Sequence, residues 1–177
     1  MKSRFVNSIY GVALVSVLTL MGATFFAPTQ NVKAQEQNKQ EEQEKSEEQG
    51  RKLEGTWRVQ VTIRICQTGA EIRTFPSLVT FAQGGTMTET TSAASPALRG
   101  PGHGVWEHSR GRTYTSVMEA FTFNPAGVWT GTQRVTQTVE LNHRSDEFEA
   151  NASSEVFDVN GVLLMTGCST AVGRRLE

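Results

Sequence analysis

The chain has 177 residues and a nearly balanced charge, with 17 Lys and Arg side chains against 18 Asp and Glu. Three basic residues and no acidic ones precede residue 35, so residues 35–177 have 14 basic and 18 acidic side chains and a net charge of −4. A protein that binds nucleic acid normally presents a basic surface, so this balance argues against a nucleic-acid partner.

Residues 1–34 have the pattern of a secretory signal. Lys2 and Arg4 form a short basic start, and an apolar run follows over residues 9–27. Small side chains stand at the −3 and −1 positions of a cleavage site after Ala34. An uncleaved anchor is the alternative, because the run is close to the ~20 residues that span a bilayer. We predict cleavage, a secreted or periplasmic protein, and no stable membrane span in the mature chain.

Residues 35–52 are polar and mostly acidic or Gln, without a single apolar side chain. Such a segment cannot bury enough surface to offset the entropy lost on ordering. It is therefore interpreted as a disordered or transiently helical linker. The alternative is an acidic arm that binds a partner.

The folded domain is predicted to cover residues 53–177, and it opens on a strand at residues 57–66. Trp57, Val59, Val61, Ile63 and Ile65 alternate there with polar residues. Period-two alternation is typical of a strand with one buried face and one solvated face. The domain is long enough to bury its own core.

Seven further strands are predicted from alternation and turn signals. Gly84-Gly85 and Asn160-Gly161 are typical of tight hairpins. The strands are expected at residues 71–81, 86–92, 105–109, 112–124, 128–141, 147–158 and 162–174. Residues 93–104, rich in Gly and Pro, are interpreted as the one long loop, and residues 100–104 within it as a mobile lid or wide turn at the mouth of the fold. The prediction is an all-β, eight-stranded, antiparallel up-and-down fold.

Closure of this sheet into a barrel is predicted from the two cysteines. Eight sequential strands leave two exposed edges unless the first pairs with the last. Cys66 ends the first strand and Cys168 lies in the last, and two cysteines in an exported protein usually form one disulfide. If they face each other directly, Trp57 lies opposite Glu177. The alternative is two buried free thiols.

Gly55-Thr56-Trp57 at the start of the first strand, with Arg174-Arg175 at the end of the last, resembles the lipocalin and wider calycin pattern. The resemblance implies that an Arg of this pair packs across Trp57 and closes one end of the barrel. It also implies a small, mostly apolar ligand in the interior. The chain departs from lipocalins in lacking a clear helix after the barrel, and from fatty-acid-binding proteins in lacking two helices after the first strand.

Candidate ligand-binding residues are those expected to face the interior. Gln133 and Gln137 share one face of their strand, and buried amides need hydrogen-bonding partners. Small residues alternate on the neighbouring strands, which indicates a cavity. The candidates are Gln133, Gln137, Tyr114, Met165 and Trp106. The alternative is that Trp129 and the glutamines form a solvated outer face or a self-satisfied network.

No motif for a nucleophile, phosphate loop or metal-ligand set occurs, so neither a cofactor nor a metal is expected. His103 and His108 flank Glu107, but a strand would place the two imidazoles on opposite faces. Glu119 is a candidate acid if it is buried, although a solvated Glu is the simpler interpretation. Three functions stay open: a ligand-binding barrel, a cyclase or isomerase of the allene-oxide-cyclase or dirigent kind, and a solid barrel with a structural or interaction role.

Overall fold

The computed structural model describes residues 35, 39–41, 45, 48 and 52–176. The predicted signal at residues 1–34 lies outside this part of the chain. In the predicted linker, residues 35, 39–41, 45 and 48 have helical backbone and exposed side chains, and Lys52 lies in a turn. None of the helical segments within the described ranges is both long and apolar enough to cross a membrane.

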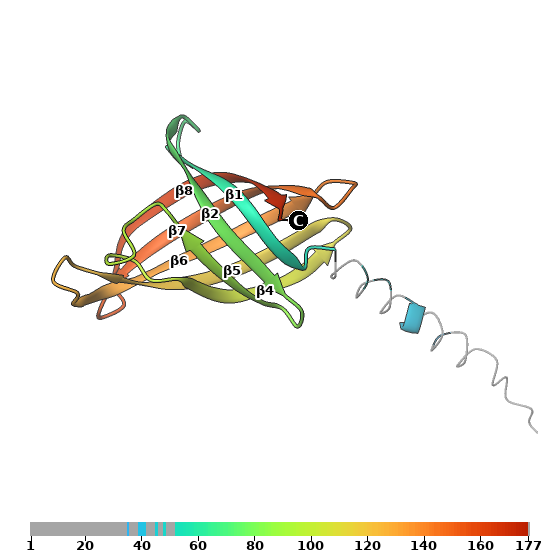
Figure 1. The fold of residues 1–177 in the computed structure, drawn as a ribbon, viewed down its shortest axis with the longest axis horizontal. Helices are drawn as coiled ribbons and strands as arrows, with labels where there is room; N and C mark the ends of the chain where they lie inside the picture. The colour runs from blue at the N-terminus through green and yellow to red at the C-terminus, as the bar shows by residue number, and fades with distance from the viewer. Residues whose placement is uncertain (1–34, 36–38, 42–44, 46–47, 49–51, 177) are drawn as a thin grey trace, which may run out of the picture.

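Eight antiparallel strands form one closed barrel, as predicted (Figure 1). Each strand pairs with the next along the chain, and the last pairs with the first. The strands are β1 Gly55–Arg64, β2 Glu71–Ala82, β3 Thr86–Thr91, β4 Gly102–Arg110, β5 Thr113–Phe123, β6 Trp129–Leu141, β7 Glu147–Asp158 and β8 Leu163–Arg175. Closure removes both edges from the paired parts of the sheet.

The pairing of β1 with β8 differs from the predicted register by two residues. Trp57 lies opposite Arg175, and Arg64 lies opposite Cys168. Cys66 is two residues beyond the end of β1, and it still forms the predicted disulfide with Cys168, with Cα atoms 5.2 Å apart. Because the shift is an even number of residues, every side chain keeps its predicted face.

The predicted loop at residues 93–104 is wrong for its last three residues, because β4 begins at Gly102. Gly102 and Gly104 lie where a side chain would collide with β5. A Cβ on Gly104 would lie 2.1 Å from the carbonyl oxygen of Val117, and one on Gly102 would lie 2.9 Å from the sulfur of Met118. Glycine therefore permits β4 to approach β5, and the Gly-rich composition reflects that approach and not a mobile lid.

The core occupies the end of the barrel where β1 begins and β8 ends. Trp57, Phe81, Tyr114, Leu141 and Phe148 are almost completely buried there. The Phe148 ring contacts those of Trp57 and Phe81, with centroid distances of 5.0 Å and 6.3 Å. This aromatic layer fills the lumen at one end, and we call it the floor.

Candidate binding site in the barrel interior

The floor is sealed by Arg175 and Trp57. The guanidinium carbon lies 4.3 Å from the centroid of the indole, whose Nε1 donates to the carbonyl of Leu53. Arg175 also donates to the carbonyls of Lys52, Glu54 and Ser145, so all three of its nitrogens are bonded. Desolvation lowers the pKa of Arg175, while the charge of Asp146 acts in the opposite direction. Arg174 faces outward and pairs with Glu147.

Trp106 and Tyr114 belong to this floor. Trp106 is buried, and its Nε1 donates to the carbonyls of Ala82 and Thr86 at 3.0 Å each. Tyr114 packs against the Trp106 ring, with centroids 6.0 Å apart. Burial raises the pKa of Tyr114, and the charge of Arg175 partly offsets that effect. Both candidates thus lie in packed surroundings at the closed end.

Beyond the floor the inner wall becomes accessible. On β6 and β7 the inward residues Val139, Leu141, Phe148 and Ala150 are buried. The inward residues closer to the mouth are only half-buried: Gln133, Val135, Gln137, Ala152, Ser154 and Val156. Met165, which pairs with Val156, is 62% exposed. The inward side chains on this side of the barrel are therefore more accessible near the mouth than at the floor.

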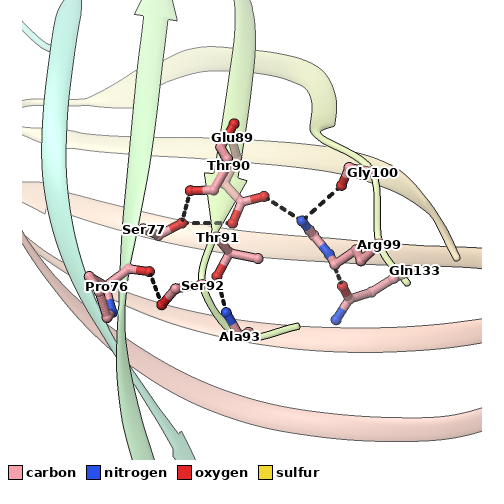
Figure 2. A network of polar contacts seen from close by, with 10 residues as sticks. All are labelled: Pro76, Ser77, Glu89, Thr90, Thr91, Ser92, Ala93, Arg99, Gly100 and Gln133. Atoms are coloured by element: carbon pink, nitrogen blue, oxygen red, sulfur yellow. Dashed lines mark hydrogen bonds and ion pairs between the residues drawn. The ribbon is translucent and has the colours of Figure 1, made fainter. Parts of the chain in front are cut away.

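A buried ion pair joins Glu89 on β3 to Arg99 in the segment of residues 92–101, and its network extends to Gln133 on β6 (Figure 2). Arg99 Nη1 is 2.8 Å from Glu89 Oε2, and both side chains are less than a tenth exposed. Glu89 Oε1 accepts from the hydroxyl of Ser77 at 2.7 Å, and Arg99 Nε donates to Gln133 Oε1 at 2.7 Å. The pair is thus neutral and hydrogen-bonded, which is how buried charges persist.

The backbone around Arg99 is held against the end of β5. Arg99 forms a bridge with Thr122, Gly100 donates its N–H to the carbonyl of Phe121, and Phe123 donates to the carbonyl of Leu98. Residues 98–100 therefore lie along the end of β5.

Neither Glu89 nor Arg99 was among the residues singled out from the sequence. Glu89 follows the same alternation as Met87, so the period-two pattern of β3 could have placed it inside. Arg99 lies outside any strand, where alternation gives no direction. Its partners are 10 and 34 residues away along the chain.

Gln133 and Gln137 each contact the wall through one amide atom. Gln133 Oε1 accepts from Arg99, and Gln137 Nε2 donates to the hydroxyl of Ser116 at 2.8 Å. The second amide atom of each has no hydrogen bond to any described residue, and neither is sealed off from solvent. Figure 2 shows the Gln133 nitrogen turned away from Arg99. The wall therefore offers one donor and one acceptor, four residues or about 13 Å apart along β6.

The other candidate acid and base lie outside the barrel. Glu119 is exposed and forms an ion pair with Arg134, at 2.6 Å, on the outer wall. His103 faces outward beside them, in a surface hollow of about 460 Å³. A second hollow, of about 440 Å³, lies beside the disulfide and is lined by residues of β6, β7 and β8, Gln137 and Ala152 among them. Within the described ranges, no three His, Cys, Asp or Glu side chains gather as a metal site.

No protein-family model matches the chain, and no curated protein shows significant similarity to it.

Proposed function

We propose that the chain is an exported, lipocalin-like barrel that binds a small, mostly apolar molecule in the open half of its interior. The observation that carries the proposal is the exposure gradient along β6, β7 and β8. Side chains such as Val135, Val156 and Met165 face inward and yet remain accessible. An inner wall that the protein's own side chains do not fill is the usual setting of a ligand in a barrel closed at one end.

The chemistry of the wall favours an uncharged ligand with few polar groups. The charges of Glu89 and Arg99 neutralise each other, so neither is free to balance a charged guest. The free amide atoms of Gln133 and Gln137 supply a donor and an acceptor that orient the molecule. Val135, Val156 and other apolar groups between them supply the burial that drives binding.

Two further observations support the calycin-like and exported parts of the proposal. The contact of Arg175 with Trp57 closes the barrel floor in the way that the sequence resemblance implies. The disulfide between Cys66 and Cys168 fits an oxidising compartment outside the cytoplasm.

The test fills the lumen without touching the floor. Ser154 faces inward with its hydroxyl close to Gly167, where a Cβ would lie 2.8 Å from Oγ, whereas its neighbour Ser153 faces outward. An apolar dye whose fluorescence rises on burial is titrated into the protein and into the variants Ser154→Phe and Ser153→Phe. We expect uptake by the wild type and by Ser153→Phe, and loss of uptake in Ser154→Phe. Equal behaviour of the two variants, or no uptake by any of them, would support a solid barrel instead.

A further inference from the structure

Two hairpins at the mouth carry a cluster of exposed large apolar side chains. The residues are Phe121, Val128 and Trp129 from the β5–β6 hairpin, and Val159, Val162, Leu163, Leu164 and Met165 from the β7–β8 hairpin. Each is 45–64% exposed. We call these eight residues the mouth patch. Single exposed apolar side chains are ordinary on a protein surface, but a contiguous group of this kind marks an interaction site.

The two hairpins are neighbours in the sheet. Gly131 on β6 pairs with Asp158 on β7, and Phe157 pairs with Leu163 on β8. Figure 1 shows both tips projecting from the same end of the barrel, away from the end where the C-terminus lies. The mouth patch is therefore one surface, made of two narrow projections beside the opening of the lumen.

No charged side chain occurs in residues 121–129 or 159–165. The nearest charge in sequence, Asp158, accepts hydrogen bonds from the backbone N–H groups of Asn160 and Val162 at 2.8 Å each, within its own turn. The indole N–H of Trp129 donates to the carbonyl of Gly131 at 2.7 Å. The patch thus presents apolar surface whose neighbouring polar groups are already bonded within the chain.

This surface matches an uncharged lipid bilayer better than a protein. A stable protein interface needs roughly 1,200 Å² or more of complementary area, with hydrogen bonds around its rim. Neither tip carries a charged side chain that could form ion pairs at the rim of such an interface. Insertion into a bilayer requires no matching shape, and Trp is enriched at the boundary between headgroups and hydrocarbon.

We propose that the mouth patch inserts into the headgroup region of a phospholipid bilayer without net charge. The opening of the barrel then faces the lipid, which is where an apolar ligand would be found. The inference is carried by the exposed residues and stands whether or not the lumen holds a ligand.

Trp129 reports on this insertion by itself. Trp57 and Trp106 are buried, whereas Trp129 is 45% exposed and belongs to the patch. The protein, isolated from its host in processed form, is mixed with vesicles of pure phosphatidylcholine. We expect co-sedimentation that high salt does not reverse, together with a blue shift of tryptophan emission. The shift should be absent in Trp129→Phe.

Two substitutions within the patch and one outside it complete the test. Val162→Glu and Leu164→Glu should weaken binding by at least about tenfold, because a carboxylate must then be desolvated. Val105→Glu, at an equally exposed apolar position on the barrel wall, should bind like the wild type. Circular dichroism of each variant confirms that the barrel is folded. Since emission of Trp129 reports on the patch alone, an N-terminal segment that binds vesicles cannot produce the shift.

Four results would overturn the inference. The first two are the absence of an emission shift with phosphatidylcholine, and binding that needs anionic lipid and is lost in high salt. The third is that the patch variants bind vesicles as well as Val105→Glu does. The fourth is that the protein is a dimer without vesicles and that the patch substitutions dissociate it. The last result would assign the surface to a second copy of the chain. Because dye uptake by Ser154→Phe and Ser153→Phe is measured without lipid, failure here is distinguishable from failure of the proposed function.

Discussion

The guanidinium of Arg175 lies over the indole of Trp57, and this contact joins the last strand to the first at the closed end of the barrel. The same side chain reaches three backbone carbonyls, two of which belong to residues just before β1. One residue near the C-terminus therefore fixes the entry of the chain into the barrel.

Arg175→Ala should lower the free energy of unfolding by about 2–4 kcal/mol, because it removes charge-assisted hydrogen bonds and a cation–π contact. Arg174→Ala is the matched control, since Arg174 is exposed and its single ion pair contributes about 0–1 kcal/mol. Urea denaturation monitored by tryptophan fluorescence measures both. Equal effects of the two substitutions would contradict the role given to Arg175.

Replacing one partner of the buried ion pair should lower the free energy of unfolding more than expected from the effect of replacing both. Glu89→Met or Arg99→Met alone leaves an uncompensated charge inside the barrel, and each should destabilise the protein by about 3–5 kcal/mol. The double variant should lie closer to the wild type than the sum of the two single changes. A double-mutant cycle from urea denaturation gives the coupling energy, and strictly additive effects would show that the charges do not interact.

Loss of the disulfide should destabilise the barrel without changing its fold. Cys66 and Cys168 are separated by 102 residues, so in the chain-entropy model the bridge contributes about 5 kcal/mol. The double variant Cys66→Ser with Cys168→Ser should keep the circular dichroism of the wild type and unfold at a lower urea concentration. A change in stability below roughly 1 kcal/mol would contradict this account of the bridge.

Acid should weaken the β7–β8 turn through Asp158. Hydrogen bonds from backbone N–H groups, chiefly that of Val162, hold the pKa of this carboxyl below its ordinary value. A lowered folded-state pKa stabilises the protein above the unfolded value of about 3.9, and the contribution is lost as pH falls through the folded pKa. Asp158→Asn keeps an acceptor oxygen but does not titrate.

The variant Asp158→Asn should therefore lose less stability than the wild type between about pH 6 and about pH 2. Denaturant midpoints measured across this range check the difference. Parallel pH profiles for the two proteins would mean that the turn does not depend on the carboxylate.

Most of the fold could be predicted because each strand has one buried and one solvated face. Apolar and polar residues therefore alternate along each strand, and tight turns such as Asn160-Gly161 mark where one strand ends and the next begins. The start of β4 was missed because Gly102 and Gly104 have no side chain to alternate. Their role is close approach to β5, which only the neighbouring strand reveals.

The interior was harder to predict than the strands. Alternation placed Gln133, Gln137 and Met165 on inward faces, but it cannot distinguish the packed floor from the accessible wall. That difference depends on contacts between side chains of different strands, such as Trp57 and Phe81 with Phe148. Arg99 shows the same limit, because its position depends on Glu89 and Gln133, and no local pattern encodes either contact.

Native mass spectrometry of the protein isolated from its own host tests the central proposal most directly, since a retained guest appears as added mass. The wild type and Ser153→Phe should carry a small molecule that is released on denaturation, and Ser154→Phe should not. Bare chains for all three proteins, or the same guest on Ser154→Phe, would contradict a ligand held in the open half of the barrel.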